Sequence, residues 1–503
     1  MRFSARAALL AGALVAPALT PSGTQAQVLE IGFDQSPVGL DMHLATAFST
    51  YAIVSGTIYE GLTAVDKSLR VIPALAQSWT VSPDGKSYVF KLRSNVAFHN
   101  GAKMDSADVA SSIRRVLSKE IASPLASRLA AIDSVATPDA ATVELKLKEP
   151  SAPLLSSLST IAIVPKEFET NKDGLQRQPI GTGPFKFEEW QPNGFIKLGK
   201  HAAYWAAGTP KLEGIKFNIA PESATRQVGV TGGTYAMLPN IDAATALQLK
   251  GKPNVTMQET LELAYTLIGL NTSKPPFDNA KVREAANYAI NRAEIVQAAL
   301  FGAGVPGGPL SPALTEWATD VKQFPCYAHD VGKAQALIKE AGLATPIAVT
   351  MNVLPRQDIK DIAQVVQAQL NKAGFKVELK NQELGQFVQD WRNSNFDMFA
   401  STNAGSVDPD DYFYRTFRTG GSTNVFKYSN PQLDKLLDEA RATLDQDARK
   451  KAYAEAQAIL ACTGPIAHLA YGQLFTALRS NVQGFDMLAN RSLVNLKNVS
   501  VGR

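Results

Sequence analysis

The chain has 503 residues, and its 50 Lys and Arg residues nearly balance its 46 Asp and Glu residues, which leaves a formal net charge of +4 at pH 7. A charge this balanced argues against nucleic acid as a partner. Hydrophobic residues make up 45% of the sequence, so the chain is expected to fold, and its length predicts two or more domains.

The first 26 residues have the pattern of a secretory signal peptide. Arg2 and Arg6 precede a short apolar run, and Ala26 ends a small-residue cleavage site. The run is shorter than the ~20 residues that span a bilayer, and no later segment reaches that length. No cysteine near Ala26 offers a lipid attachment point. We therefore expect a periplasmic protein whose signal peptide is cleaved near Ala26. We also expect it to be a monomer.

Strands and helices alternate irregularly along the chain, which predicts an α/β fold. In the first half, residues 87–94 and 141–149 alternate apolar and polar side chains as half-buried strands do, and residues 105–117 between them have helical spacing behind an N-cap at Asp105 or Ser106. In the second half, helices are expected at 281–302, 330–342, 358–374, 430–444 and 446–461, and strands at 347–354, 375–380 and within 464–480. The order strand, helix, strand over 347–380 predicts a parallel pair.

Signatures of enzymes and metal sites are scarce. The chain has no G-x-S-x-G, no H-E-x-x-H and no cysteine pair at zinc spacing, so no catalytic residue, metal or cofactor is predicted. Cys326 and Cys462 form a disulfide if the fold brings them together in the oxidising periplasm, and otherwise remain two buried thiols.

Two loops that leave strand ends are candidate binding sites. The first holds His43, Leu44 and Ala45, and follows a strand-like run at 29–35. The second holds Arg356, where a guanidinium beside a helix N-terminus suits an anion. The alternative for Arg356 is a solvated side chain that pairs with a nearby aspartate.

A third candidate is the stretch STNAGSVDPDDYF, residues 401–413, with the aromatic residues around it. Trp391 precedes the stretch and Tyr412 ends it, and both could line a cleft. Asp408 and Asp410 flank Pro409, a pattern that indicates a turn capping the next helix.

Several ordered motifs resemble the extracellular solute-binding proteins of ATP-driven (ABC) importers, in the family 5 class that serves dipeptides, oligopeptides, nickel complexes and related solutes. The motifs lie in residues 72–116, 179–217, 267–296 and 428–442. The resemblance implies a two-lobed periplasmic binding protein fold with a hinge and an interlobe cleft. Lobe I would span residues 27–265, with 475–503 returning to it, and lobe II residues 266–474, with crossings near 262–270 and 470–478.

The resemblance also assigns roles to single residues. In peptide-binding members an aspartate three residues before D-P-D pairs with the peptide amino group, and here that position is Gly405. Arg356 matches the arginine that receives the peptide carboxylate. His99, Gly181 and Gly183 are expected to shape turns away from the cleft.

These observations predict a non-enzymatic binding protein that captures a peptide-like or amino-acid-derived solute with an anionic group and delivers it to ABC permease subunits in the inner membrane. The predicted cleft residues are His43, Leu44, Ala45, Arg356, Trp391, Thr402, Asn403, Gly405, Ser406, Asp408 and Tyr412. Two alternatives remain open. One is a protein of the same fold that binds a nickel or haem chelate, and the other is a secreted hydrolase that uses Asp408 and Asp411.

Overall fold

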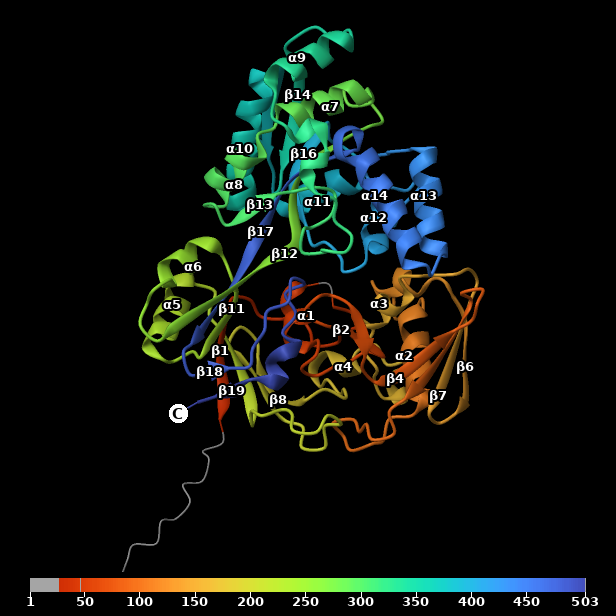
Figure 1. Ribbon diagram of the computed structural model, residues 1–503. Coiled ribbons are helices and arrows are strands. Elements are labelled where there is room, and N and C mark those ends of the chain that lie inside the picture. The colour runs from red at the N-terminus through yellow and green to blue at the C-terminus, as the bar shows by residue number, and fades with distance from the viewer. Residues whose placement is uncertain (1–26, 46, 503) are drawn as a thin grey trace, which may run out of the picture.

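The structure, a computed structural model, describes residues 27–45 and 47–502, so the predicted signal peptide lies outside the described part of the chain. The protein is a two-lobed α/β molecule (Figure 1). No helix in the described range is long and apolar enough to cross a membrane.

An 11-stranded mixed sheet runs through both lobes. Its strands, in spatial order, are β15 (Phe375–Asn381), β14 (Ile347–Val353), β16 (Met398–Asn403), β12 (Val255–Leu270), β17 (Ile466–Arg479), β11 (Met237–Ile241), β1 (Val28–Phe33), β10 (Gly214–Ile219), β9 (Phe195–Lys200) and β8 (Phe185–Gln191), with β13 (Gly304–Pro306) paired to β17.

The long antiparallel strands β12 and β17 connect the lobes (Figure 1). Their pairing extends from Val255 opposite Arg479 to Gly269 opposite Ile466. The crossings expected at 262–270 and 470–478, and the lobe boundaries after residues 265 and 474, fall within these two strands. We use lobe I for the elements before β12 and after β17, and lobe II for those between them.

Lobe I adds a second sheet to its share of the large one. This sheet has the order β4 (Ala76–Val81), β5 (Ser87–Leu92), β7 (Thr142–Leu147) and β6 (Ile132–Asp139). The remaining elements of lobe I are β2 (Thr63–Val65), β3 (Val71–Pro73), β18 (Val482–Gln483), β19 (Ser500–Val501), α1 (Phe48–Val54), α2 (Ser106–Leu117), α3 (Leu154–Leu158), α4 (Gly174–Arg177), α5 (Ser223–Gly232) and α6 (Ala243–Leu249), with the short 3₁₀ helices η1 (Ala126–Leu129), η2 (Lys166–Phe168) and η5 (Val494–Asn498). The predicted helix at 105–117 is confirmed, and Asp105 caps it in a reciprocal box with Asp108.

The motif residues of lobe I bind one another. The His99 ring contacts the Gly183 carbonyl through Nε2 at 3.0 Å, and the His201 ring contacts the same carbonyl through Nδ1 at 3.0 Å. The half-buried Glu60 carboxylate accepts hydrogen bonds from Tyr204 and Trp205. These contacts join segments of lobe I that lie far apart in sequence.

Lobe II contains α7 (Ala280–Ala289), α8 (Arg292–Ala299), α9 (Val331–Glu340), α10 (Gln357–Lys372), α11 (Leu384–Arg392), α12 (Pro409–Phe417), α13 (Pro431–Ala442) and α14 (Gln446–Thr463), with the 3₁₀ helices η3 (Val321–Gln323) and η4 (Pro325–Tyr327). The predicted parallel pair is confirmed as β14 and β15, with α10 between them in sequence. The single helix expected over 281–302 is wrong, because the chain breaks at Ile290 and Asn291, whose side chain accepts the Glu294 amide and caps α8.

Candidate functional site

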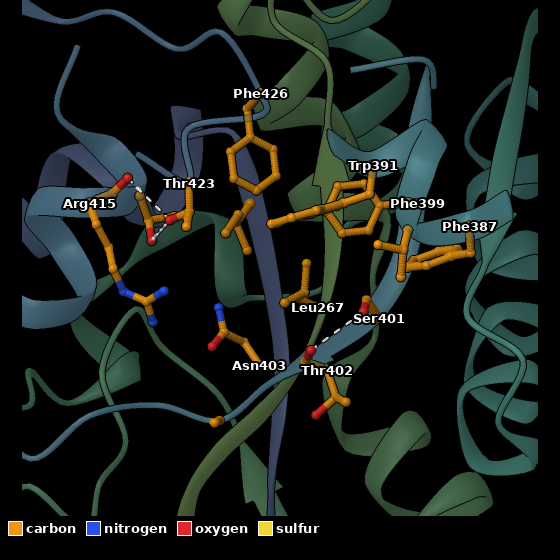
Figure 2. Close-up of a pocket in the computed structure, with 14 residues that line it drawn as sticks. Leu267, Phe387, Trp391, Phe399, Ser401, Thr402, Asn403, Arg415, Thr423 and Phe426 are labelled. Carbon is orange, nitrogen blue, oxygen red and sulfur yellow. Dashed lines mark hydrogen bonds between the residues drawn. The ribbon is translucent and has the colours of Figure 1, made fainter. Parts of the chain in front are cut away.

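A pocket of about 320 Å³ lies in lobe II, beside the end of β16 and the helices α11 and α12 (Figure 2). We call it the β16 pocket. Its lining residues are Leu267, Phe387, Val388, Trp391, Phe399, Ser401, Thr402, Asn403, Ala404, Arg415, Thr416, Thr423, Phe426 and Ile466. Aromatic and aliphatic side chains with a few polar groups are typical of small-molecule sites.

The two sides of the β16 pocket differ in chemistry. Figure 2 shows Phe387, Trp391 and Phe399 on one side, and Asn403 and Arg415 on the other. Phe399 packs edge-on against Phe387 with ring centroids 6.2 Å apart, so two rings of the aromatic wall support each other. The pocket therefore suits a molecule with an apolar end and a polar or charged end.

Arg415 is the single charged residue among those that line the pocket. It lies in the second turn of α12, where its Nε donates to the Asp411 carbonyl at 2.7 Å. Within residues 27–45 and 47–502, no carboxylate forms an ion pair with Arg415. Its terminal nitrogens remain available to an anion, and a guanidinium binds a carboxylate through two parallel hydrogen bonds.

The end of β16 offers main-chain groups to the pocket. On one side β16 pairs with β12 as far as Asn403, but on the other its pairing with β14 ends at Ala400. The Ala400 carbonyl accepts the Leu354 amide at 3.1 Å, and Thr402, two residues on, directs its main-chain groups to the same side. There Thr402 has no backbone partner in the described chain, and its carbonyl accepts the Ser401 hydroxyl at 3.4 Å (Figure 2). The Thr402 amide is therefore the group that an amide-containing ligand can bind.

Comparison with known proteins identifies the family. Residues 70–424 match the model for bacterial extracellular solute-binding proteins, family 5. The chain belongs to this family. This confirms the resemblance drawn from the motifs, and family 5 proteins bind small solutes for ABC transporter permeases.

Relatives of this family 5 protein bind several solutes. It is 28% identical to the dipeptide-binding protein of Escherichia coli K12, over 92% of this chain and 93% of the relative. It is 30% identical to the glutathione-binding protein of Salmonella typhi, over 86% of both chains. The structure of the oligopeptide-binding protein of Bacillus subtilis with a nonapeptide matches with a TM-score of 0.81 and 26% identity, covering 95% of this chain and 99% of the other. The comparisons do not favour the metal-chelate or the hydrolase alternative.

The structure brings three of the predicted cleft residues together. Trp391, Thr402 and Asn403 all line the β16 pocket. Leu44 and Ala45 are half-buried in lobe I and are not among the residues that line it.

His43 lies in the interior of lobe I, with both ring nitrogens occupied. Nε2 donates to the Ala162 carbonyl at 2.8 Å, and Nδ1 accepts from Arg115 at 3.0 Å. Arg115 in turn forms a buried ion pair with Asp41 at 2.6 Å. Burial lowers the pKa of His43 to about 4, so the ring is neutral and serves as a structural acceptor.

Arg356 is exposed and pairs with Asp358 at 2.5 Å. This arrangement is the alternative to anion binding, a solvated side chain paired with a nearby aspartate. Arg356 does not line the β16 pocket, whereas Arg415 does. Arg415 is not among the cleft residues predicted from the sequence. The sequence signal that points to Arg415 is the helix start at Pro409. The first two turns of this helix follow the predicted cleft segment directly, and Arg415 lies in the second turn.

Two aspartates of the stretch 401–413, Asp408 and Asp410, have separate structural partners. Asp408 caps α12 by accepting the Asp410 amide at 2.9 Å and pairs with Arg449 at 2.7 Å. Asp410 is buried and pairs with Arg441 at 2.6 Å. The expected capping turn is confirmed. Tyr412 is buried too, with its hydroxyl 3.0 Å from Nε2 of His468.

Gly405 follows the pocket segment in a conformation that excludes a side chain. Its φ is +71°, and a Cβ there would collide with the Leu263 carbonyl oxygen and lie 2.6 Å from the carbonyl carbon. Ser406, next in the chain, donates to Asp411 at 2.8 Å. The backbone of β12 therefore occupies the space that a carboxylate at position 405 would need.

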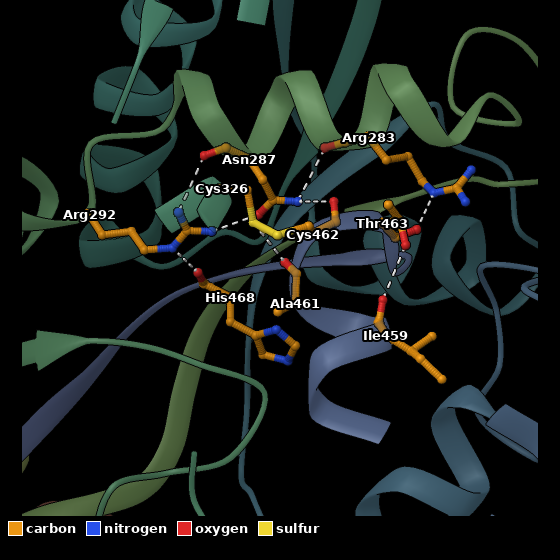
Figure 3. Close-up of a disulfide and its surroundings, with 9 residues drawn as sticks. All are labelled: Arg283, Asn287, Arg292, Cys326, Ile459, Ala461, Cys462, Thr463 and His468. Carbon is orange, nitrogen blue, oxygen red and sulfur yellow. Dashed lines mark hydrogen bonds between the residues drawn. A yellow bond between two sulfur atoms is a disulfide. The ribbon is translucent and has the colours of Figure 1, made fainter. Parts of the chain in front are cut away.

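Cys326 and Cys462 form the disulfide that the sequence left open (Figure 3). It joins η4 to the last turn of α14, and Cys326 is fully buried. Asn287 supports the junction by donating to the Cys462 carbonyl at 3.1 Å and accepting from Arg292 at 2.7 Å. The disulfide lies within lobe II and does not line the β16 pocket.

Proposed function

We propose that this family 5 protein captures an anionic, peptide-like or amino-acid-derived solute in the periplasm and delivers it to an ABC permease by hinge closure. One observation carries the proposal. The β16 pocket contains one unpaired cation, Arg415, and no carboxylate. A solute carboxylate is the complementary group.

Each part of such a solute has a counterpart in the pocket. Its carboxylate pairs with Arg415, and a carbonyl of the solute accepts the main-chain amide of Thr402. Its apolar end contacts Trp391 and the aromatic residues around it, where a buried side chain contributes about 1.5–3 kcal/mol. The volume of about 320 Å³ suits a compound the size of a modified amino acid or a dipeptide.

A free amino group is expected to weaken binding. A buried ammonium needs a counter-charge, and removing one partner of a buried ion pair costs about 3–5 kcal/mol. The family position for that partner is Gly405, where Leu263 leaves no room for a side chain. Compounds whose amino group is acylated avoid this cost.

Closure follows from the construction of the hinge. β12 and β17 are the long connections between the lobes, so a small change in their twist moves one lobe against the other. A solute shifts the balance between open and closed forms only by its difference in affinity for the two.

A thermal-shift panel tests the proposal. It compares free dipeptides, N-acetylated dipeptides and N-acetylated dipeptide amides, which differ stepwise in charge at each end. A ligand at one hundred times its Kd adds about 2.7 kcal/mol of stability. We expect the N-acetylated acids to stabilise the protein most and the amides to have little effect.

Two matched variants assign the anion site. Arg415→Gln should abolish the shift with N-acetylated dipeptides, while Arg356→Gln should leave it unchanged, because Arg356 is exposed and paired with Asp358. The reverse result would move the anion site to the loop that the sequence favoured. Strong stabilisation by free dipeptides alone would refute the preference for a blocked amino group.

A further inference from the structure

An ion pair joins the two lobes beside the β16 pocket. Arg128, in η1 of lobe I, lies 3.4 Å from the Asp411 carboxylate of α12 in lobe II. A hydrogen bond from its Nη1 to the Thr160 hydroxyl at 2.9 Å orients Arg128. On the other side, Ser406 donates to the same Asp411 oxygen at 2.8 Å. Asp411 therefore connects lobe II to lobe I.

Asp411 is also connected to the pocket. Arg415 follows it by four residues on α12, and the Asp411 carbonyl already accepts the Arg415 Nε at 2.7 Å. An acid four residues before a base is the favourable arrangement for an ion pair on a helix. In this structure the Asp411 carboxylate pairs with Arg128 of the other lobe, while Arg415 of its own lobe contacts only the Asp411 main-chain carbonyl.

We propose that Asp411 exchanges partners when solute binds. In the open form Asp411 pairs with Arg415, because Arg128 is withdrawn with lobe I. A solute carboxylate takes over Arg415, and the released Asp411 carboxylate then pairs with Arg128 across the cleft, which favours the closed form. Asp411 is a positioning residue here, since it contacts Arg415 and not the solute. The inference rests on the proposed anionic solute, and its test does not.

The size of the effect follows from the exposure of the pair. The side chains of Arg128 and Asp411 are 33% and 24% exposed, so the pair is partly screened by solvent. An exposed ion pair shifts a two-state equilibrium by a factor of about two to five. Exchange therefore biases closure and leaves most of the closed-state stability to other contacts, such as the hydrogen bond from the Ala152 amide to the Arg441 carbonyl.

The test measures closure in the absence of any solute. Spin labels on Lys146→Cys in lobe I and Lys435→Cys in lobe II, whose native side chains are 61% and 76% exposed, report the interlobe distance by double electron–electron resonance. Arg415→Gln removes the charge as a solute anion would, so the ratio of closed to open protein should rise about two- to fivefold. Arg415→Lys keeps the charge and should leave the ratio near that of the unmodified protein.

Two double variants separate exchange from simple loosening of the site. Arg128→Gln combined with Arg415→Gln should remove the increase, because Asp411 has no partner across the cleft. Asp411→Asn should make the ratio insensitive to Arg415→Gln. An Arg415→Gln protein with an unchanged ratio, or an increase that persists without Arg128, overturns the exchange. A failure of the N-acetylated dipeptides to bind would overturn the solute assignment alone.

Discussion

Gly405 offers a sharp test of how the backbone restricts this site. The perturbation is Gly405→Ala, which adds one Cβ. At a φ of +71° an alanine pays about 1–2 kcal/mol for the left-handed conformation. The Cβ also meets the Leu263 backbone and comes within 2.9 Å of its Cβ. Forcing atoms into an occupied site costs a further 1–3 kcal/mol or so, which gives a total loss of about 2–5 kcal/mol.

Gly420 provides the matched control. Its φ is +74°, but a Cβ there would meet no atom within 4 Å. Gly420→Ala should therefore lose only the conformational part, about 1–2 kcal/mol. The difference between the two variants, read from urea unfolding followed by circular dichroism, isolates the collision with Leu263.

Gly405→Asp extends the test from stability to solute binding. It restores the carboxylate of peptide-binding relatives, but we expect it to be at least as destabilising as Gly405→Ala and to give no binding of free dipeptides, because Leu263 blocks the position. If Gly405→Ala and Gly420→Ala lose equal stability, the collision argument is wrong. If Gly405→Asp gains free-dipeptide binding, the loop adapts to the added side chain. The expectation that Leu263 excludes a carboxylate at position 405 is then wrong.

Two further predictions concern stability. Replacing Cys326 and Cys462 by alanine should cost up to about 5 kcal/mol at 25 °C, because the disulfide closes a loop across a sequence separation of 136 residues, and urea midpoints with and without reductant check it. Burial lowers the pKa of His43 and His99 to about 4 and that of His468 to about 3, so an unfolded chain takes up these protons first as the pH falls below about 6.5. Stability should be full above pH 6.5 and decline steadily toward pH 4. His468→Gln should flatten that decline in urea titrations at pH 7.5 and 5, and an unchanged slope would contradict the assignment.

The sequence predicted the elements whose signals are local. The helix expected at 358–374 and the strands around it match α10, β14 and β15 to within one or two residues, because apolar spacing and flanking glycines mark them. The break between α7 and α8 was missed. Asn291 makes that break by capping α8, and an asparagine within a helical pattern gives only a weak signal.

The site was predicted where it is continuous in the chain. Thr402 and Asn403, predicted for the cleft, line the β16 pocket because both lie at the end of one strand, β16. His43 was assigned to the cleft because the sequence does not show that Arg115, in a helix of the same lobe, holds its ring. Arg356 and Arg415 are a similar case. Each follows a strand or turn near the expected cleft, and the sequence shows neither that Arg415 on α12 lines the pocket nor that Arg356 pairs with Asp358 instead.

The two features proposed to set selectivity act on opposite ends of the proposed peptide-like solute. The family resemblance implies an aspartate before D-P-D for the amino end, whereas this chain has Gly405 at that position and a cation, Arg415, in the β16 pocket. The first change is fixed by the Leu263 backbone, and the second depends on a side chain that Asp411 can also bind. A switch toward free peptides therefore needs movement of β12 as well as substitution at position 405. Loss of anion binding needs only the loss of Arg415, so the two selectivities are expected to change independently.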